Sequence, residues 1–140
     1  MTSAFPLGGT TIYFEFETRD ETPRISAPEE FGELLGASTI MDHRDRIDVV
    51  IDYPLTRPTT LHMDKPITVE RFSRGVSAAY RVIYQEEART SSTNAGLVPG
   101  TLNRGETDGT YGIVMHGIEG LYLEGATLKE DGKWYLMIGS

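Results

Sequence analysis

The chain has 140 residues, 39% of them apolar, which is the size of one domain whose core removes roughly 70% of the unfolded surface from water. Acidic residues outnumber basic ones by 21 to 13, and the formal net charge of -8 disfavours nucleic acid and anionic membranes as partners. The absence of cysteine excludes disulfides, thiolate zinc sites and thiol nucleophiles.

Three elements are expected in the N-terminal half. Alternating apolar and polar residues predict a half-buried strand at Thr10–Thr18. A short helix is expected at Ala27–Leu35, because Ser26-Ala-Pro-Glu29 has the form of a capping box with proline in the first turn. A second strand is expected at Arg46–Tyr53, and the prolines after it end the pairing and leave an extended segment.

The longest helix is expected at Thr68–Arg89, with Thr68 as its N-cap. Its apolar residues recur at helical spacing, which predicts one face packed on the core. That face comprises Val69, Phe72, Val76, Ala79, Tyr80, Ile83 and Tyr84. Gly75 in the helix interior costs about 1 kcal/mol relative to alanine, and the close approach of a strand would account for it.

A long polar stretch at residues 90–110 is rich in turn formers. Loops of this length are usually functional or disordered, so we expect a mobile loop that borders the functional site, if the protein has one. A strand is then expected at Tyr111–His116 and a turn at Gly117–Gly120.

The last two expected strands, Leu121–Lys129 and Lys133–Ile138, form a hairpin. Asp131-Gly132 has the composition of a two-residue type I′ turn, which would place Glu130 opposite Lys133. The residues that then share one face are Trp134, Leu136 and Ile138.

His116 is the main catalytic candidate in the sequence. Glu119 and Glu124 lie near it along the chain, so they could orient a histidine base or join it as metal ligands. A histidine at a strand end beside a glycine turn is more often structural. The favoured prediction is therefore a non-enzymatic protein in which His116 has no catalytic role. If the protein is an enzyme, the residues expected to act are His116, Glu119 and Glu124.

No signature of a metal site, a nucleotide site or a covalent intermediate is found. None of the three histidines is spaced with another as a pair of metal ligands would be. Ser91 and Ser92 are not set in a nucleophile elbow, and no glycine-rich segment opens a helix as a phosphate cradle does. The sequence therefore predicts no metal and no cofactor.

The final hairpin provides the best sequence argument for a protein partner. Tyr122, Trp134, Tyr135 and Met137 are large side chains on a sheet, and only one face of a sheet packs against helices unless both are covered. We expect these four residues to form a binding surface for a partner. Self-association through paired edge strands is the other contact that the sequence allows.

Several short words occur in a fixed order across residues 53–140. They are Pro54-Leu, Ile67-Thr-Val, Ala79-Tyr-Arg-Val-Ile-Tyr-Gln-Glu-Glu, Leu102-Asn-Arg, Thr107-Asp-Gly-x-Tyr-Gly-Ile, His116-x-Ile-x-x-Leu-x-Leu-Glu-Gly and Leu136-x-Ile-Gly-Ser. Together they resemble small uncharacterised proteins encoded by large nucleocytoplasmic DNA viruses of algae and protists. The resemblance leaves the N-terminal third unmatched. It implies a shared fold and a viral setting, favours a virion component or host-interaction protein over a metabolic enzyme, and transfers no catalytic residue.

The sequence thus predicts a single α+β domain with a mainly antiparallel sheet packed on one long helix, with one short helix beside it. The N-terminus lacks the basic end and apolar run of a signal peptide, and no apolar stretch approaches the ~20 residues that span a bilayer. We therefore expect an intracellular protein that is neither secreted nor inserted in a membrane. The favoured function is a non-enzymatic protein-interaction or structural module, and the alternative is a small hydrolase or ligand-binding enzyme centred on His116.

Overall fold

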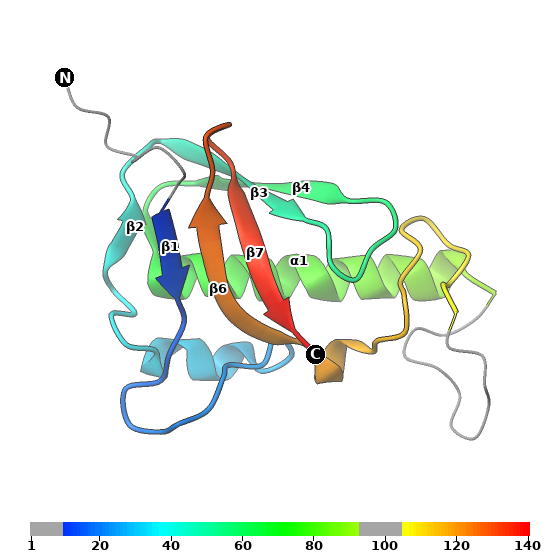
Figure 1. Cartoon of the computed structure of the whole chain (residues 1–140), viewed down its shortest axis with the longest axis horizontal. Helices are drawn as coiled ribbons and strands as arrows, with labels where there is room; N and C mark the ends of the chain where they lie inside the picture. Colours follow the sequence, from blue (N-terminus) through cyan, green and yellow to red (C-terminus); the bar gives the residue numbers. More distant parts are fainter. Residues whose placement is uncertain (1–9, 93–104) are drawn as a thin grey trace.

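Five strands form the main sheet of the computed structural model, which describes residues 10–92 and 105–140 (Figure 1). The strands are β1 (Thr10–Tyr13), β3 (Arg46–Ile51), β4 (Thr59–Asp64), β6 (Tyr122–Leu128) and β7 (Trp134–Gly139). Their order across the sheet is β1-β6-β7-β3-β4, and every neighbouring pair is antiparallel except β3 and β7. The predicted α+β fold with a mainly antiparallel sheet is confirmed.

Shorter elements complete the fold. The strands β2 (Ile40–Asp42) and β5 (Ile67–Thr68) form a separate two-stranded sheet. The described residues also include two 3-10 helices, η1 (Pro28–Glu33) and η2 (Ile118–Gly120). Within the described residues, no helix combines the length and the apolar character needed to cross a membrane.

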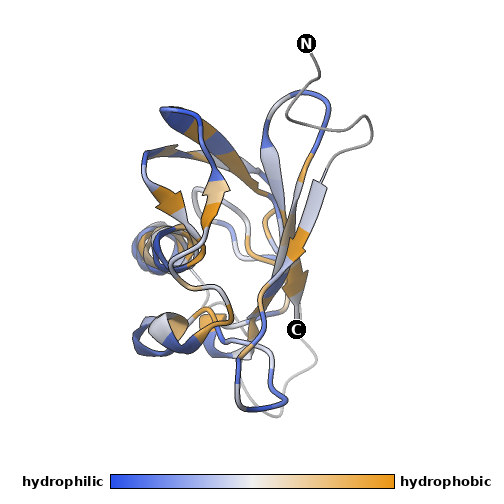
Figure 2. Cartoon of the chain, turned by 90° about the vertical axis from the view of Figure 1, so that its left-hand side faces the viewer, coloured by the Kyte–Doolittle hydropathy of each residue, from blue (hydrophilic) through white to orange (hydrophobic). Residues whose placement is uncertain are grey.

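The helix α1 (Val69–Thr90) lies within one residue of its predicted bounds. Thr68 caps it as predicted, because its hydroxyl accepts a hydrogen bond from the N–H of Arg71 at 3.1 Å. Phe72 and Tyr80 on the apolar face are completely buried. The Phe72 ring contacts the Trp134 ring of β7 edge-on, with centroids 5.8 Å apart. Figure 2 shows α1 and η1 on the same side of the main sheet.

Two predictions for the N-terminal third need correction. The helix expected at Ala27–Leu35 is the 3-10 helix η1, whose N-cap residue Ala27 makes no side-chain bond, so the predicted capping box is wrong. The strand expected at Thr10–Thr18 ends at Tyr13. Its alternation persists beyond that point, since Phe14 and Phe16 are both buried.

Two predictions for the rest of the chain also fail. The segment after Pro54 was expected to stay unpaired, but it contains β4, which pairs with β3 in full register. Tyr111–His116 is not a strand, because it forms only isolated bridges and Met115 has a left-handed φ of 67°. Of the loop predicted at 90–110, residues 93–104 lie outside the described part of the chain.

The hairpin of β6 and β7 is present, but its turn is longer than predicted. The N–H of Lys129 donates to the carbonyl of Lys133 at 3.0 Å, so Lys129 faces Lys133 and Glu130 does not. Gly132 adopts a φ of 81°, a region that favours glycine, and it ends a loop of three residues. The turn therefore resembles a type I turn followed by a left-handed glycine.

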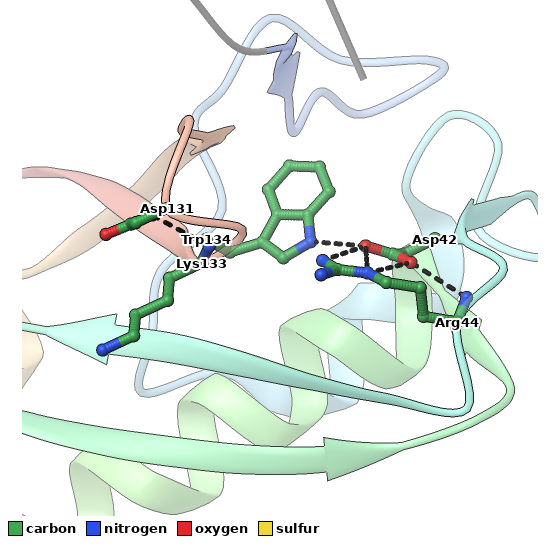
Figure 3. Close-up of polar contacts among 5 residues, drawn as sticks. All are labelled: Asp42, Arg44, Asp131, Lys133 and Trp134. Carbon is green, nitrogen blue, oxygen red and sulfur yellow. Dashed lines mark hydrogen bonds and ion pairs between the residues drawn. The ribbon is translucent and has the colours of Figure 1, made fainter. Parts of the chain in front are cut away.

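A buried carboxylate joins the small sheet to the main sheet (Figure 3). Asp42 at the end of β2 is 2% exposed and accepts the indole N–H of Trp134 at 3.0 Å. It also accepts Nη2 of Arg44 at 2.8 Å. Burial would raise the pKa of Asp42, but the hydrogen bonds from Arg44 and Trp134 outweigh burial and lower it. Asp42 is thus held as a charged group in the interior.

We expect Asp42→Ala to lower the free energy of unfolding by about 3 kcal/mol, because Arg44 and the Trp134 indole would lose a buried partner. Urea denaturation measures this difference. Asp45→Ala is the matched control, since its carboxylate is 86% exposed and pairs with Lys65 on the surface. Equal unfolding midpoints for the two variants would show that the buried carboxylate does not hold the two sheets together.

Candidate binding groove

Among the described residues, β4 is the last strand of the main sheet and pairs with β3 alone, so its outer edge is open. Just beyond β4, the N–H of Lys65 donates to the carbonyl of Asp45 at 2.9 Å. In an antiparallel pair the backbone groups alternate, so every second residue before Lys65 directs its N–H and C=O groups toward β3. The residues between them, Thr60, His62 and Asp64, direct their N–H and C=O groups away from β3. No other residue in ranges 10–92 and 105–140 bonds these groups.

A groove of about 480 Å³ runs between this edge and the flank of α1. Its apolar walls include Leu61 and Met63 from β4, with Ala78, Ala79 and Val82 from α1. Val82 is apolar and yet 60% exposed. The strand contact predicted at Gly75 is present, because a Cβ on this glycine would lie 2.7 Å from Cε of Met63. Small side chains on α1 thus leave the groove unfilled beside an open strand edge.

Tyr111 lines one end of the groove, and a buried glutamate on α1 holds it there. Glu87 is 1% exposed and accepts the backbone N–H groups of Gly109, Tyr111 and Gly112 at 2.9, 2.7 and 3.1 Å. The hydroxyl of Thr107 also donates to it. Burial would raise the pKa of Glu87, but these hydrogen bonds lower it below its ordinary value of 4.5. A carboxylate therefore replaces the strand pairing that the sequence predicts for this segment.

The described residues do not bring the proposed catalytic group together. The His116 ring lies beside the Tyr53 ring with centroids 5.8 Å apart and planes tilted by 40°, and the His116 carbonyl accepts the hydroxyl of Tyr84 at 2.8 Å. In the described part of the chain, its imidazole makes no hydrogen bond to Glu119 or Glu124. No group of three or more potential metal ligands occurs among those same residues. Within the described residues, His116 is therefore not paired with either carboxylate named in the enzymatic alternative.

The predicted aromatic surface is divided between the two faces of the sheet. Trp134 is 1% exposed, because its indole packs on α1 and donates a hydrogen bond to Asp42 in the core. Trp134 is therefore not part of an exposed surface. Tyr135 and Met137 are half-buried on the opposite face, as strand alternation requires. Tyr122 is also half-buried, with the guanidinium of Arg24 centred 5.6 Å from its ring. Tyr122, Tyr135 and Met137 thus keep part of their surface exposed to solvent.

No protein-family model, curated protein or solved structure matches this chain. The resemblance to viral proteins therefore stays a prediction from the sequence. The interpretation of the groove depends on its own chemistry.

Sequence reasoning missed the groove because it missed β4. The prolines after β3 predict an end to the pairing, yet Leu61 and Met63 alternate with polar residues at the period of a strand. That alternation was the available signal. The α1 wall of the groove corresponds in the sequence to Ala78 and Val82, two exposed positions on a helix that is otherwise predicted well. No local pattern indicates that these positions flank an open edge.

We expect Glu87→Gln to weaken the dependence of stability on acid pH. The pKa of Glu87 is lower in the folded chain than in the unfolded chain. Ionised Glu87 therefore contributes fully to the free energy of unfolding above pH 4.5, and this contribution is lost as pH falls through the pKa of the folded state. Urea denaturation at about pH 7, 5 and 3.5 should therefore give a smaller loss for the variant than for the wild type. Glu86→Gln, on the surface of the same helix turn, is the control and should keep the wild-type pH slope. Identical slopes for all three proteins would contradict the assignment.

Proposed function

We propose that the protein is a non-enzymatic protein-interaction module that binds its partner in the groove between β4 and α1. The observation that supports this function is the row of outward backbone groups on β4 beside an apolar channel. In the unbound protein, water forms the hydrogen bonds of the unpaired backbone groups on β4. Such open edges are known templates for pairing with another chain. Apolar walls next to such an edge give a bound chain both hydrogen bonds and buried surface.

The composition supports a protein as the partner. A net charge of -8 repels nucleic acid and anionic lipid at long range, and so favours a neutral or basic protein surface. From the resemblance to viral proteins, we further propose an intracellular setting, in the virion or the host cytoplasm. The half-buried Tyr122, Tyr135 and Met137 lie outside the groove and would add a second contact only with a large partner.

Ala78→Glu should reduce partner binding at least ten-fold, because a carboxylate would face the apolar groove without a partner of its own. Ala88→Glu is the matched control, since Ala88 is an exposed alanine on another side of the same helix. Tagged wild type and both variants are used to capture proteins from the cells that express the chain. Each captured protein is then purified and titrated against the three forms by calorimetry.

A partner that binds the wild type and Ala88→Glu equally, and Ala78→Glu at least ten-fold more weakly, would support the proposed function. Far-ultraviolet circular dichroism checks that both variants fold. If every captured partner binds the three proteins with the same affinity, the groove is not the contact surface.

A further inference from the structure

We infer that the groove accepts an extended segment that adds to β4 as an antiparallel strand, with apolar side chains at alternate positions and a lysine or arginine opposite Asp64. This inference rests on the proposed function, since it specifies the partner that the groove binds. The backbone of β4, the walls of the groove and the charge of Asp64, the last residue of β4, each restrict the segment.

The backbone of β4 selects an extended chain. Thr60, His62 and Asp64 each direct one N–H and one C=O outward, so three residues with two groups each offer six hydrogen bonds. An incoming strand satisfies all six by matching this spacing, whereas a helix has already used its own backbone groups. Antiparallel pairing is somewhat more stable per residue than parallel pairing, which sets the direction of the segment.

The walls select apolar side chains at alternate positions. In an added strand, the residues opposite Thr60, His62 and Asp64 place their side chains on the outer face of the sheet. The two residues between them point toward α1, beside Leu61 and Met63. They enter the channel of about 480 Å³ that small residues on α1 leave open. Valine, isoleucine or leucine at these two positions would exclude water from the channel.

The charge of Asp64, at the end of β4, favours a cationic residue on the added strand. Asp64 is exposed and forms no ion pair within the described residues, although Arg46 lies across from it on β3. A lysine or arginine opposite Asp64 on the added strand completes a cross-strand pair of opposite charges. The negative net charge of the chain attracts such a segment at long range.

A second copy of this chain fits the groove less well than a free segment. Two β4 strands paired about a two-fold axis lie about 4.8 Å apart. Because α1 flanks β4 and contacts Met63 at Gly75, the two helices would approach each other beneath the paired strands. Packed helices need 8–10 Å between their axes. A segment without its own helix avoids this conflict.

The test uses three blocked synthetic peptides and nuclear magnetic resonance of the full chain. The probe contains Lys-Val-Thr-Val-Thr, in which lysine faces Asp64 and the valines face the groove. A second peptide replaces lysine by glutamate, and a third replaces both valines by serine. We expect saturable shifts from the probe at the amides of Thr60, His62 and Asp64 and at the methyl groups of Ala78 and Val82, and no saturation with the serine peptide.

The charge is tested by reversal. The wild type should bind the lysine peptide about three-fold more tightly than the glutamate peptide, as expected for a cross-strand ion pair. Asp64→Lys should reverse this preference. Asp20→Lys, which makes the same charge change at an exposed residue outside the groove, should keep it.

Three outcomes would overturn the inference. The first is the absence of saturable shifts at millimolar probe, and the second is the same charge preference in wild type and Asp64→Lys. The third is a dimer in sedimentation that Ala78→Glu abolishes, since a second copy would then occupy the groove. If captured partners still depend on Ala78 while the probe gives no saturable shifts, the inference fails and the proposed function stands.

Discussion

The helix α1 has to cover much of one face of the five-stranded sheet, and the rest of the structure depends on how it does so. Five strands span about 19 Å, whereas a helix with its side chains is about 10–12 Å wide. The helix α1 flanks β4, and the N-terminal segment packs beside it through Phe14, Phe31 and Ile25. Because α1 and the N-terminal segment divide the cover of the sheet between them, small residues of α1 face the open edge of β4.

Two buried carboxylates hold together segments that lie far apart in the sequence. Asp42 ties β2 and the Trp134 indole together, and Glu87 gathers the N–H groups of residues 109–112 at the end of α1. Each is surrounded by donors, which is the condition under which a charge is tolerated in a protein interior. An acidic chain thus places two of its negative charges in the interior, where several hydrogen-bond donors surround each of them.

The parts of the fold that local periodicity specifies were predictable. α1 follows from helical spacing and the cap at Thr68, and the β6–β7 hairpin follows from the alternation in β7 and the glycine of the turn, although β6 has a bulge between Leu123 and Gly125. The failures arise where distant residues decide. Tyr111–His116 has a strand-like pattern, but Glu87 takes its N–H groups from another element. Trp134 alternates as expected, yet its burial depends on Asp42, which lies 92 residues away in the sequence. No sequence window contains both partners.

Trp134 is the only tryptophan of the chain, and its position makes it an intrinsic optical probe. Its indole lies in the core, in contact with Phe72 of α1 and hydrogen-bonded to Asp42 of β2. The emission of this ring therefore reports on the point where the helix and the two sheets meet. It does not line the β4–α1 groove, so a ligand there leaves the fluorophore's immediate surroundings intact. One wavelength can thus follow unfolding of the core separately from occupation of the groove.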